Sequence, residues 1–193
     1  MALMEHIQKH YGLKVEYYNL NEKLDIWSDW PKDDIKLIIT GVGVNNVISA
    51  LSAAVYLGIL NPCVDVINVG YAGANWINVG EVVCVKDAHC FEFPKIANTE
   101  IKNCIKLSNE GFDCYTSFDF VSNAYFITEP VVFDMELAYI ARFIHRSLYS
   151  IKIVSDNLDY NGFKEFNGEE AWKKAIDKIE ERRRVNVSRY STP

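Results

Sequence analysis

The chain has 193 residues, a formal charge of −6 at pH 7 and an apolar content typical of globular proteins. Its length suits one domain with a substantial core and is short for two. The acidic balance argues against a nucleic-acid surface, which requires clustered basic residues, and no apolar run approaches the roughly 20 residues of a membrane span. We therefore expect a cytoplasmic protein with one domain over residues 1–193 and with neither nucleic acid nor a membrane as partner.

Neither a basic surface nor a metal motif stands out in the sequence. The one dense basic run, EERRRVNVSRY at 180–190, lies beside acids and favours a solvated helix end. Five cysteines form no C-x-x-C pair, so we expect reduced, mostly buried thiols rather than a disulfide framework or a zinc site. His89 has no second ligand beside it, and we assign no metal and no cofactor.

Strand and helix patterns alternate in the first half of the chain. Residues 36–42 (KLIITGV) and 64–70 (VDVINVG) are short runs rich in Ile and Val, which is typical of buried strands. Between them, small and apolar residues recur at helical spacing over 45–60. Together these segments predict a β-α-β unit.

The second half continues the alternation. Residues 81–93 predict a strand, and the aromatic and β-branched residues of 114–128 predict one or two more. A helix from about Met135 to His145 leads into a strand over 148–156, and an amphipathic helix follows over 168–184.

This alternation predicts an α/β fold. We expect a three-layer α/β/α sandwich with a central mixed, mostly parallel sheet. In such folds the pocket lies outside the carboxyl ends of the strands. Functional residues should therefore follow strands, as the segments 41–43, 70–73 and 155–156 do in the predicted pattern.

Asp134, Met135 and Glu136 stand at the entrance of an otherwise apolar helix. Acids in a first helical turn interact favourably with its unpaired N–H groups and its dipole. Helix capping is therefore one explanation for both acids.

Four segments in order resemble the nucleoside phosphorylase and nucleosidase superfamily, and most closely its methylthioadenosine/S-adenosylhomocysteine nucleosidases. They are TGVGVNNVISA (40–50), INVGYAGANWINVGEVV (67–83), FDMELAYIA (133–141) and KIVSDNLD (152–159). Each motif alone is weak, but four in correct order and spacing are hard to obtain by accident.

In this superfamily the helix entrance faces the ribose. The resemblance implies that Met135 packs on the sugar and that Glu136 accepts hydrogen bonds from its hydroxyls. A carboxylate suits this task because charge-assisted hydrogen bonds are stronger than neutral ones. Its charge would also favour the positive charge that develops on the ribosyl ring. Sugar binding is thus the second explanation for Glu136.

The resemblance places the base near the end of the strand at 148–156. Asp156 matches the family's aspartate at the purine N7; desolvation there would raise its pKa and let it donate a proton to the departing base. Ser-Asp is also common at turns and caps. Lys152 stands where these nucleosidases commonly carry arginine, and it either pairs with a carboxylate or reaches solvent at a strand edge.

The remaining substrate contacts implied by the resemblance are less specific. Phe120, or Val121 if the match is shifted by one residue, would stack on the base, although a core role for Phe120 is an equal alternative. Gly73, Ala72 and Ser155 would line the substrate, and glycine lets a backbone approach a ligand closely.

Whether water or phosphate is the expected nucleophile depends on the side chains at the positions where phosphorylases bind phosphate. Where phosphorylases carry a phosphate-binding arginine and serine, this chain has Asn68 and Tyr71, and no arginine precedes Arg142. A hydrolase fits better, and the resemblance assigns its water-orienting glutamate to Glu5. The strand that should precede Glu5 is missing or shortened.

The sequence thus predicts a nucleosidase-like enzyme that hydrolyses the N-glycosidic bond of a purine nucleoside or a 5′-thio-nucleoside. Its partner would be that small-molecule nucleoside, and the resemblance implies a homo-oligomer, a dimer or larger. Two alternatives stay open: a nucleoside-binding protein of the same fold with weak or lost catalysis, and a phosphate-dependent nucleoside phosphorylase.

Overall fold

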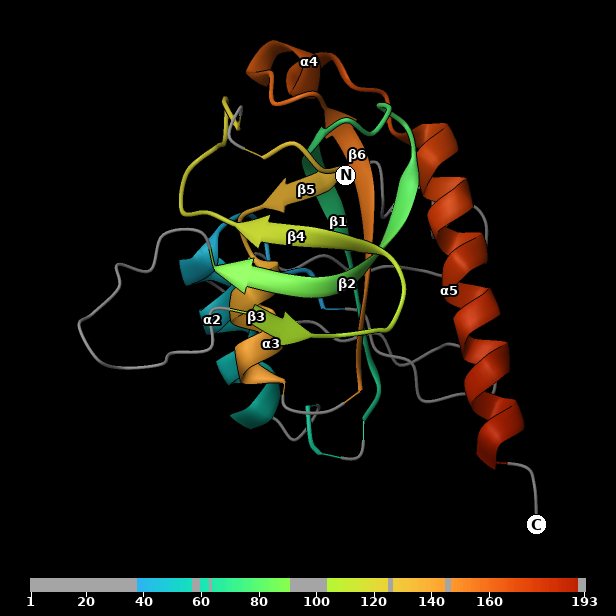
Figure 1. Cartoon of the computed structure of the whole chain (residues 1–193). Coiled ribbons are helices and arrows are strands. Elements are labelled where there is room, and N and C mark those ends of the chain that lie inside the picture. The colour runs from blue at the N-terminus through green and yellow to red at the C-terminus, as the bar shows by residue number, and fades with distance from the viewer. Residues whose placement is uncertain are drawn as a thin grey trace.

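The computed structural model describes residues 38–56, 60–62, 64–90, 104–124, 127–144 and 147–190, with side chains up to residue 182. Within these ranges the chain forms four helices and six strands (Figure 1). The helices are α2 (Val44–Tyr56), α3 (Leu137–Phe143), α4 (Tyr160–Glu165) and α5 (Glu169–Tyr190). The strands are β1 (Val66–Asn75), β2 (Val82–Cys90), β3 (Cys104–Lys106), β4 (Phe112–Thr116), β5 (Val131–Asp134) and β6 (Leu148–Asp156). This order confirms the predicted mixed α/β class.

The strands form one sheet in the order β3-β2-β4-β5-β1-β6, with a further pairing between β2 and β6. The pairs β1/β6, β2/β4 and β4/β5 are parallel, whereas β1/β5, β2/β3 and β2/β6 are antiparallel. The predicted mixed sheet is confirmed, but parallel pairs do not predominate among the described strands. Because β2 also pairs with β6, the sheet curls back on itself, and the three-layer sandwich is not confirmed.

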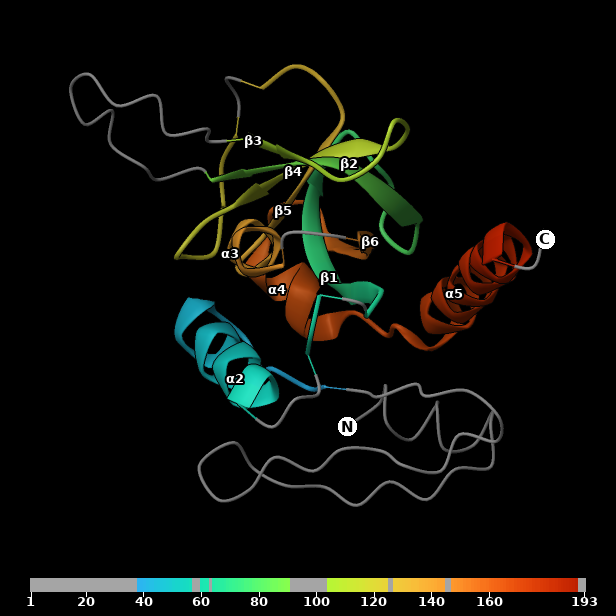
Figure 2. The same cartoon turned by 90° about the horizontal axis from the view of Figure 1, so that it is seen from below.

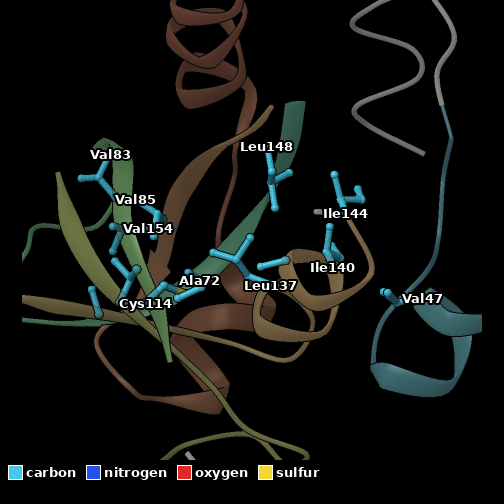
Figure 3. Close-up of a cluster of buried hydrophobic side chains, with 14 of the residues drawn as sticks. Val47, Ala72, Val83, Val85, Cys114, Leu137, Ile140, Ile144, Leu148 and Val154 are labelled. Carbon is cyan, nitrogen blue, oxygen red and sulfur yellow. The ribbon is translucent and has the colours of Figure 1, made fainter. Parts of the chain in front are cut away.

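The alternation along β6 decides which helix covers each of its faces. Val154 belongs to the larger core cluster with Leu137 of α3 (Figure 3). Its neighbours Ile151 and Ile153 belong to a second cluster with Trp172 of α5. The helices α3 and α5 therefore lie on opposite sides of β6 (Figure 2).

Most elements expected from the sequence are present. The predicted helices at 45–60, 135–145 and 168–184 correspond to α2, α3 and α5, and the strand at 148–156 is β6. The predicted strand at 64–70 corresponds to β1, which continues to Asn75, so the segment 70–73 lies inside a strand and does not follow one. No described helix has the length and apolar character needed to cross a membrane.

Two local predictions are wrong in the described residues, and one strand was not predicted. Residues 38–42, the described part of the expected strand at 36–42, are irregular, and positive φ values of 77° and 90° at Gly41 and Gly43 turn the chain into α2. After Thr116 the expected strand at 114–128 gives way to a crossover, because β4 and β5 are parallel and cannot be joined by a short turn. Residues 131–134, for which the sequence predicted no element, form β5.

Candidate active site

Asp156 is the last residue of β6, and its carboxyl group is buried. The residue is 1% exposed, and a register shift in the β1–β6 ladder sets it opposite Gly73. Ser155 Oγ donates a hydrogen bond to Asp156 Oδ2 at 2.8 Å, and the Asp159 N–H donates to Oδ1 at 3.2 Å. Both carboxyl oxygens are thus fixed by neighbours along the same stretch of chain.

Burial raises the pKa of Asp156, although hydrogen bonds from Ser155 and from the backbone of Asp159 and Leu158 act in the opposite direction. A carboxyl group with a raised pKa keeps its proton to higher pH and can serve as a general acid. The desolvation predicted for Asp156 is confirmed by this environment.

Gly73 provides the space that the Asp156 carboxyl group occupies. A Cβ atom at position 73 would lie 2.8 Å from Asp156 Oδ1, closer than real Cβ contacts. Ala72 is buried, and its carbonyl oxygen lies 3.3 Å from Ser155 Oγ. The structure therefore brings three predicted substrate contacts, Gly73, Ala72 and Ser155, to the immediate surroundings of Asp156.

Asp134 ends β5 and acts as the cap of α3. Its Oδ2 accepts a hydrogen bond from the Leu137 N–H at 2.9 Å, and its Oδ1 accepts one from Thr116 Oγ1 at 2.5 Å. Thr116 Oγ1 in turn accepts from the Ala138 N–H at 2.9 Å. The parallel register of β4 and β5 sets Thr116 beside Asp134. Capping is thus the correct explanation for Asp134.

Lys152 reaches Asp134 from the middle of β6. Its Nζ lies 2.7 Å from Asp134 Oδ2, and the two residues are 1% and 5% exposed. Of the two alternatives for Lys152, pairing with a carboxylate is confirmed and reaching solvent is wrong. Burial by itself lowers the pKa of Lys152, but the Asp134 charge and its neighbours outweigh burial, so the pKa is raised. The ammonium group stays charged, and Asp134 neutralises it.

Glu136 occupies the N-cap position of α3 but makes no capping hydrogen bond to that helix. Its Oε1 instead accepts from the Gly43 N–H at 2.6 Å, and its Oε2 accepts from the Met135 N–H at 3.3 Å. Gly43 directly precedes α2, whose N-terminus attracts negative charge. Capping of α3 is therefore wrong for Glu136. Burial and the nearby Asp134 charge raise its pKa.

The two carboxylates of interest belong to different parts of the sheet. Glu136 lies two residues after the end of β5, where Asp134 pairs with Lys152. Asp156 ends β6, four residues beyond Lys152, and four residues of an extended strand span about 13 Å. The structure therefore places these two acids at the ends of two different strands of one sheet, with β1 between them.

The predicted stacking residues lie next to the segment that follows Asp156. The Phe120 ring packs edge-on against Tyr160 of α4 with centroids 5.5 Å apart, and α4 lies beyond the end of β6 (Figure 1). Val121 packs against the buried side chains of Val131 and Phe133. Val121 therefore contributes to a core cluster, and stacking by Phe120 stays a prediction.

Other expected residues lie away from these groups or outside the described residues. Glu5 is outside them. Tyr71 faces α5, where its hydroxyl oxygen accepts a hydrogen bond from Trp172 Nε1 at 2.6 Å. His89 stacks on Tyr115 at 4.6 Å. Within the described part of the chain, no group of three His, Cys, Asp or Glu residues could hold a metal ion.

Sequence reasoning missed Thr116, which links β4 to the cap of α3. Nothing in the local sequence distinguishes it from any threonine near a strand end. Its role follows only from the parallel register of two strands whose contacting residues are 18 positions apart.

No protein-family model matches the chain, and no curated protein sequence matches it. Solved structures do match its fold. The 5′-methylthioadenosine/S-adenosyl homocysteine nucleosidase of Helicobacter pylori has a TM-score of 0.72 at 14% identity, with 93% of this chain and 94% of that chain covered. A futalosine hydrolase mutant of the same organism has a TM-score of 0.72 at 13% identity, covering 93% and 95%. The corresponding nucleosidase of S. pneumoniae has a TM-score of 0.70 at 16% identity, covering 91% of each chain.

These neighbours are members of the nucleoside phosphorylase and nucleosidase superfamily, as the sequence motifs led us to expect. The motif residues also converge in space, since Asp134 of one motif pairs with Lys152 of another. At this level of identity the likeness establishes the fold: the chain has the fold of the hydrolytic nucleosidases of that superfamily.

Proposed function

We propose that the chain hydrolyses the N-glycosidic bond of a purine nucleoside or a 5′-thio-nucleoside. The observation that carries this proposal is the buried carboxyl group of Asp156, whose pKa is raised and which ends β6 in a fold shared with nucleosidases. Protonation of the departing base is the step that a neutral carboxylic acid at this place can perform.

In the proposed reaction Asp156 gives its proton to a ring nitrogen of the base. The bond between the base and the sugar breaks, and its electron pair leaves with the base. Water adds to the sugar carbon, and Glu5, the residue that the family resemblance assigns, accepts the proton that this water loses. Return of that proton to Asp156 through solvent completes the cycle, with the free base and the free sugar as products.

Glu136 and Met135 would hold the sugar. Glu136 Oε1 is occupied by a short bond from Gly43, whereas the bond from Met135 to Oε2 is long at 3.3 Å. Oε2 therefore keeps capacity to accept a sugar hydroxyl. A carboxylate in this buried setting would also stabilise positive charge on the ribosyl ring.

Water suits this site better than phosphate. A helix N-terminus is a natural anion site, but the Glu136 carboxylate already meets the amide that precedes α2. The buried Lys152 ammonium group is already paired with Asp134. A phosphate dianion placed here would be repelled by two acidic side chains. The Lys152 charge would attract it little, because Asp134 already compensates that charge. Both effects disfavour the phosphorylase alternative.

The test is base release, followed by chromatography, from adenosine, inosine, methylthioadenosine and S-adenosylhomocysteine, each with and without phosphate. We expect release that is independent of phosphate, and a loss of about 100-fold or more in Asp156→Asn. Asp177→Asn, on the exposed side of α5, is the matched control and should keep its rate. Strict dependence on added phosphate would favour the phosphorylase.

A binding protein of the same fold would give a different result. It would release no base from any of the four compounds, yet one of them would raise its melting temperature. In that case Asp156→Asn would alter the thermal shift without altering any rate, and the hydrolase proposal would be rejected.

The proposal keeps four expectations from the sequence: a single domain over residues 1–193, a three-layer arrangement of helices and sheet, a homo-oligomer and a cytoplasmic location. Exposed apolar side chains on α2, including Ile48, Val55 and Tyr56, support a subunit contact. Light scattering coupled to gel filtration would measure the oligomeric state directly.

A further inference from the structure

Leu158 lies over the space between Gly73 and Asp156. A Cβ atom on Gly73 would be 3.1 Å from Leu158 Cδ2 and 2.8 Å from Asp156 Oδ1, so both side chains converge on the surface of Gly73. The Leu158 side chain is half-buried and packs against the cluster of Val131 and Phe133. It therefore lies beside the Asp156 carboxyl group, over the same surface of Gly73.

The backbone of this turn is held in an unfavourable conformation. Leu158 has φ +62°, in the left-handed region that costs a bulky residue energy. The turn is kept in place by the acid itself, since the amides of Leu158 and Asp159 donate hydrogen bonds to the Asp156 carboxyl group. Asp159 then caps α4 by accepting from the N–H groups of Asn161 and Gly162.

We propose that Leu158 is a gating residue that controls access of the base to Asp156, an inference that rests on the proposed nucleosidase function. Asp156 is only 1% exposed, and Leu158 shares the surface of Gly73 with its carboxyl group, so in the proposed gate a base nitrogen reaches the carboxyl oxygen once Leu158 has left Gly73. When Leu158 moves away from Gly73, its side chain loses its packing against the cluster of Val131 and Phe133. The same movement relieves the left-handed backbone at Leu158. In the proposed gate the protein exchanges between this closed arrangement and an open one in which Leu158 has left Gly73.

This arrangement reduces the apparent affinity for the nucleoside. When only a fraction of molecules is competent to bind, the apparent dissociation constant is the intrinsic constant divided by that fraction. Shortening the side chain at position 158 removes contacts that hold the closed state and also clears the approach to Asp156. The variant should therefore bind its substrate more tightly than the natural chain.

The test compares Leu158→Ala with Leu107→Ala. Leu107 is also a partly buried leucine, which directly follows β3 and packs on the main core cluster. For the best substrate of the panel we expect KM to fall about fivefold in Leu158→Ala, with kcat within about twofold of the natural chain. Leu107→Ala should leave KM unchanged. A raised KM in Leu158→Ala would overturn the proposal, because Leu158 would then contact the substrate instead of blocking it.

A second measurement does not need catalysis. In the ligand-free protein an open turn admits water to Asp156, so carbon-13 NMR of its carboxyl group without substrate should show a pKa nearer the ordinary value of 3.8 in Leu158→Ala than in the natural chain. Failure of the natural chain to release any base would reject the nucleosidase, whereas an unchanged Asp156 pKa in Leu158→Ala would reject the gate. If Leu158→Ala does not fold, Leu158→Asn, which tolerates the left-handed backbone, should change KM and the pKa in the same directions.

Discussion

Replacing Lys152 by methionine should strongly destabilise the protein without changing its packing volume much. The ammonium group is 1% exposed and lies 2.7 Å from Asp134 Oδ2, so the variant leaves a carboxylate buried without its counter-charge. Breaking one partner of such a pair typically costs 3–5 kcal/mol of unfolding free energy. Because Thr116 and Leu137 still donate hydrogen bonds to Asp134, we expect a value near the lower end, about 3 kcal/mol.

Urea unfolding at pH 7, followed by circular dichroism, measures this loss. Lys173→Met is the matched control, since Lys173 makes an ion pair of nearly equal length, 2.8 Å to Glu170, on the exposed surface of α5. It should have little measurable effect. The double variant Lys152→Met with Asp134→Asn should be less destabilised than the sum of its single variants by about 2 kcal/mol. Equal effects of Lys152→Met and Lys173→Met would refute the reasoning.

Three further predictions concern residues of the candidate site. Gly73→Ala should cost about 1–3 kcal/mol of stability and slow base release, because the added Cβ would lie 2.8 Å from Asp156 Oδ1. The control Gly70→Ala should cost less, because its Cβ would lie at an ordinary 3.5 Å from its nearest neighbour. Glu136→Gln should lower kcat/KM about 10- to 100-fold, the worth of one charge-assisted hydrogen bond, while Glu110→Gln on an exposed turn should not. Asp156→Asn should gain stability relative to the natural chain as pH rises above 3.8, the ordinary pKa of an aspartate. The reason is that the natural carboxyl group has a raised pKa in the folded protein, so it contributes stability at low pH and loses this contribution as it ionises. Melting temperatures of both proteins across pH measure the difference. A flat difference between the two proteins across that range would contradict the raised pKa.

The elements with strong local signals could be predicted from sequence. The run at 148–156 combines β-branched residues with a terminal Ser-Asp, and its bounds agree with β6. The elements that escaped prediction are short, such as β3 and α4, or depend on distant partners. The segment 131–134 carries no turn signal before the helix, and it becomes a strand because β1 and β4 flank it. Closure of the sheet between β2 and β6 likewise has no local signature.

The candidate site was predictable as residue types and only partly as contacts. Motif order pointed to Asp156, Glu136 and Lys152, and the pairing of Lys152 with a carboxylate was one of two alternatives. Its partner, Asp134, could not be distinguished from Glu136 by sequence, since both stand at the same helix entrance. Only the register of β5 against its neighbours decides which acid turns inward.

Three acids within one small region thus acquire three different capacities from their partners. Asp134 contacts the Lys152 ammonium group, the Thr116 hydroxyl and the Leu137 N–H. These partners within the fold account for its position without a ligand. Glu136 has one strong partner and one long one, and burial and the Asp134 charge raise its pKa although the Lys152 charge acts in the opposite direction. Among the described residues, Asp156 receives hydrogen bonds from its own neighbours along the chain, and it lies in a setting that favours its neutral form. Burial favours the neutral forms of Glu136 and Asp156, whereas the charge of Asp134 is compensated by Lys152. This asymmetry is the physical reason for proposing ligand binding and proton transfer for Glu136 and Asp156 rather than for Asp134.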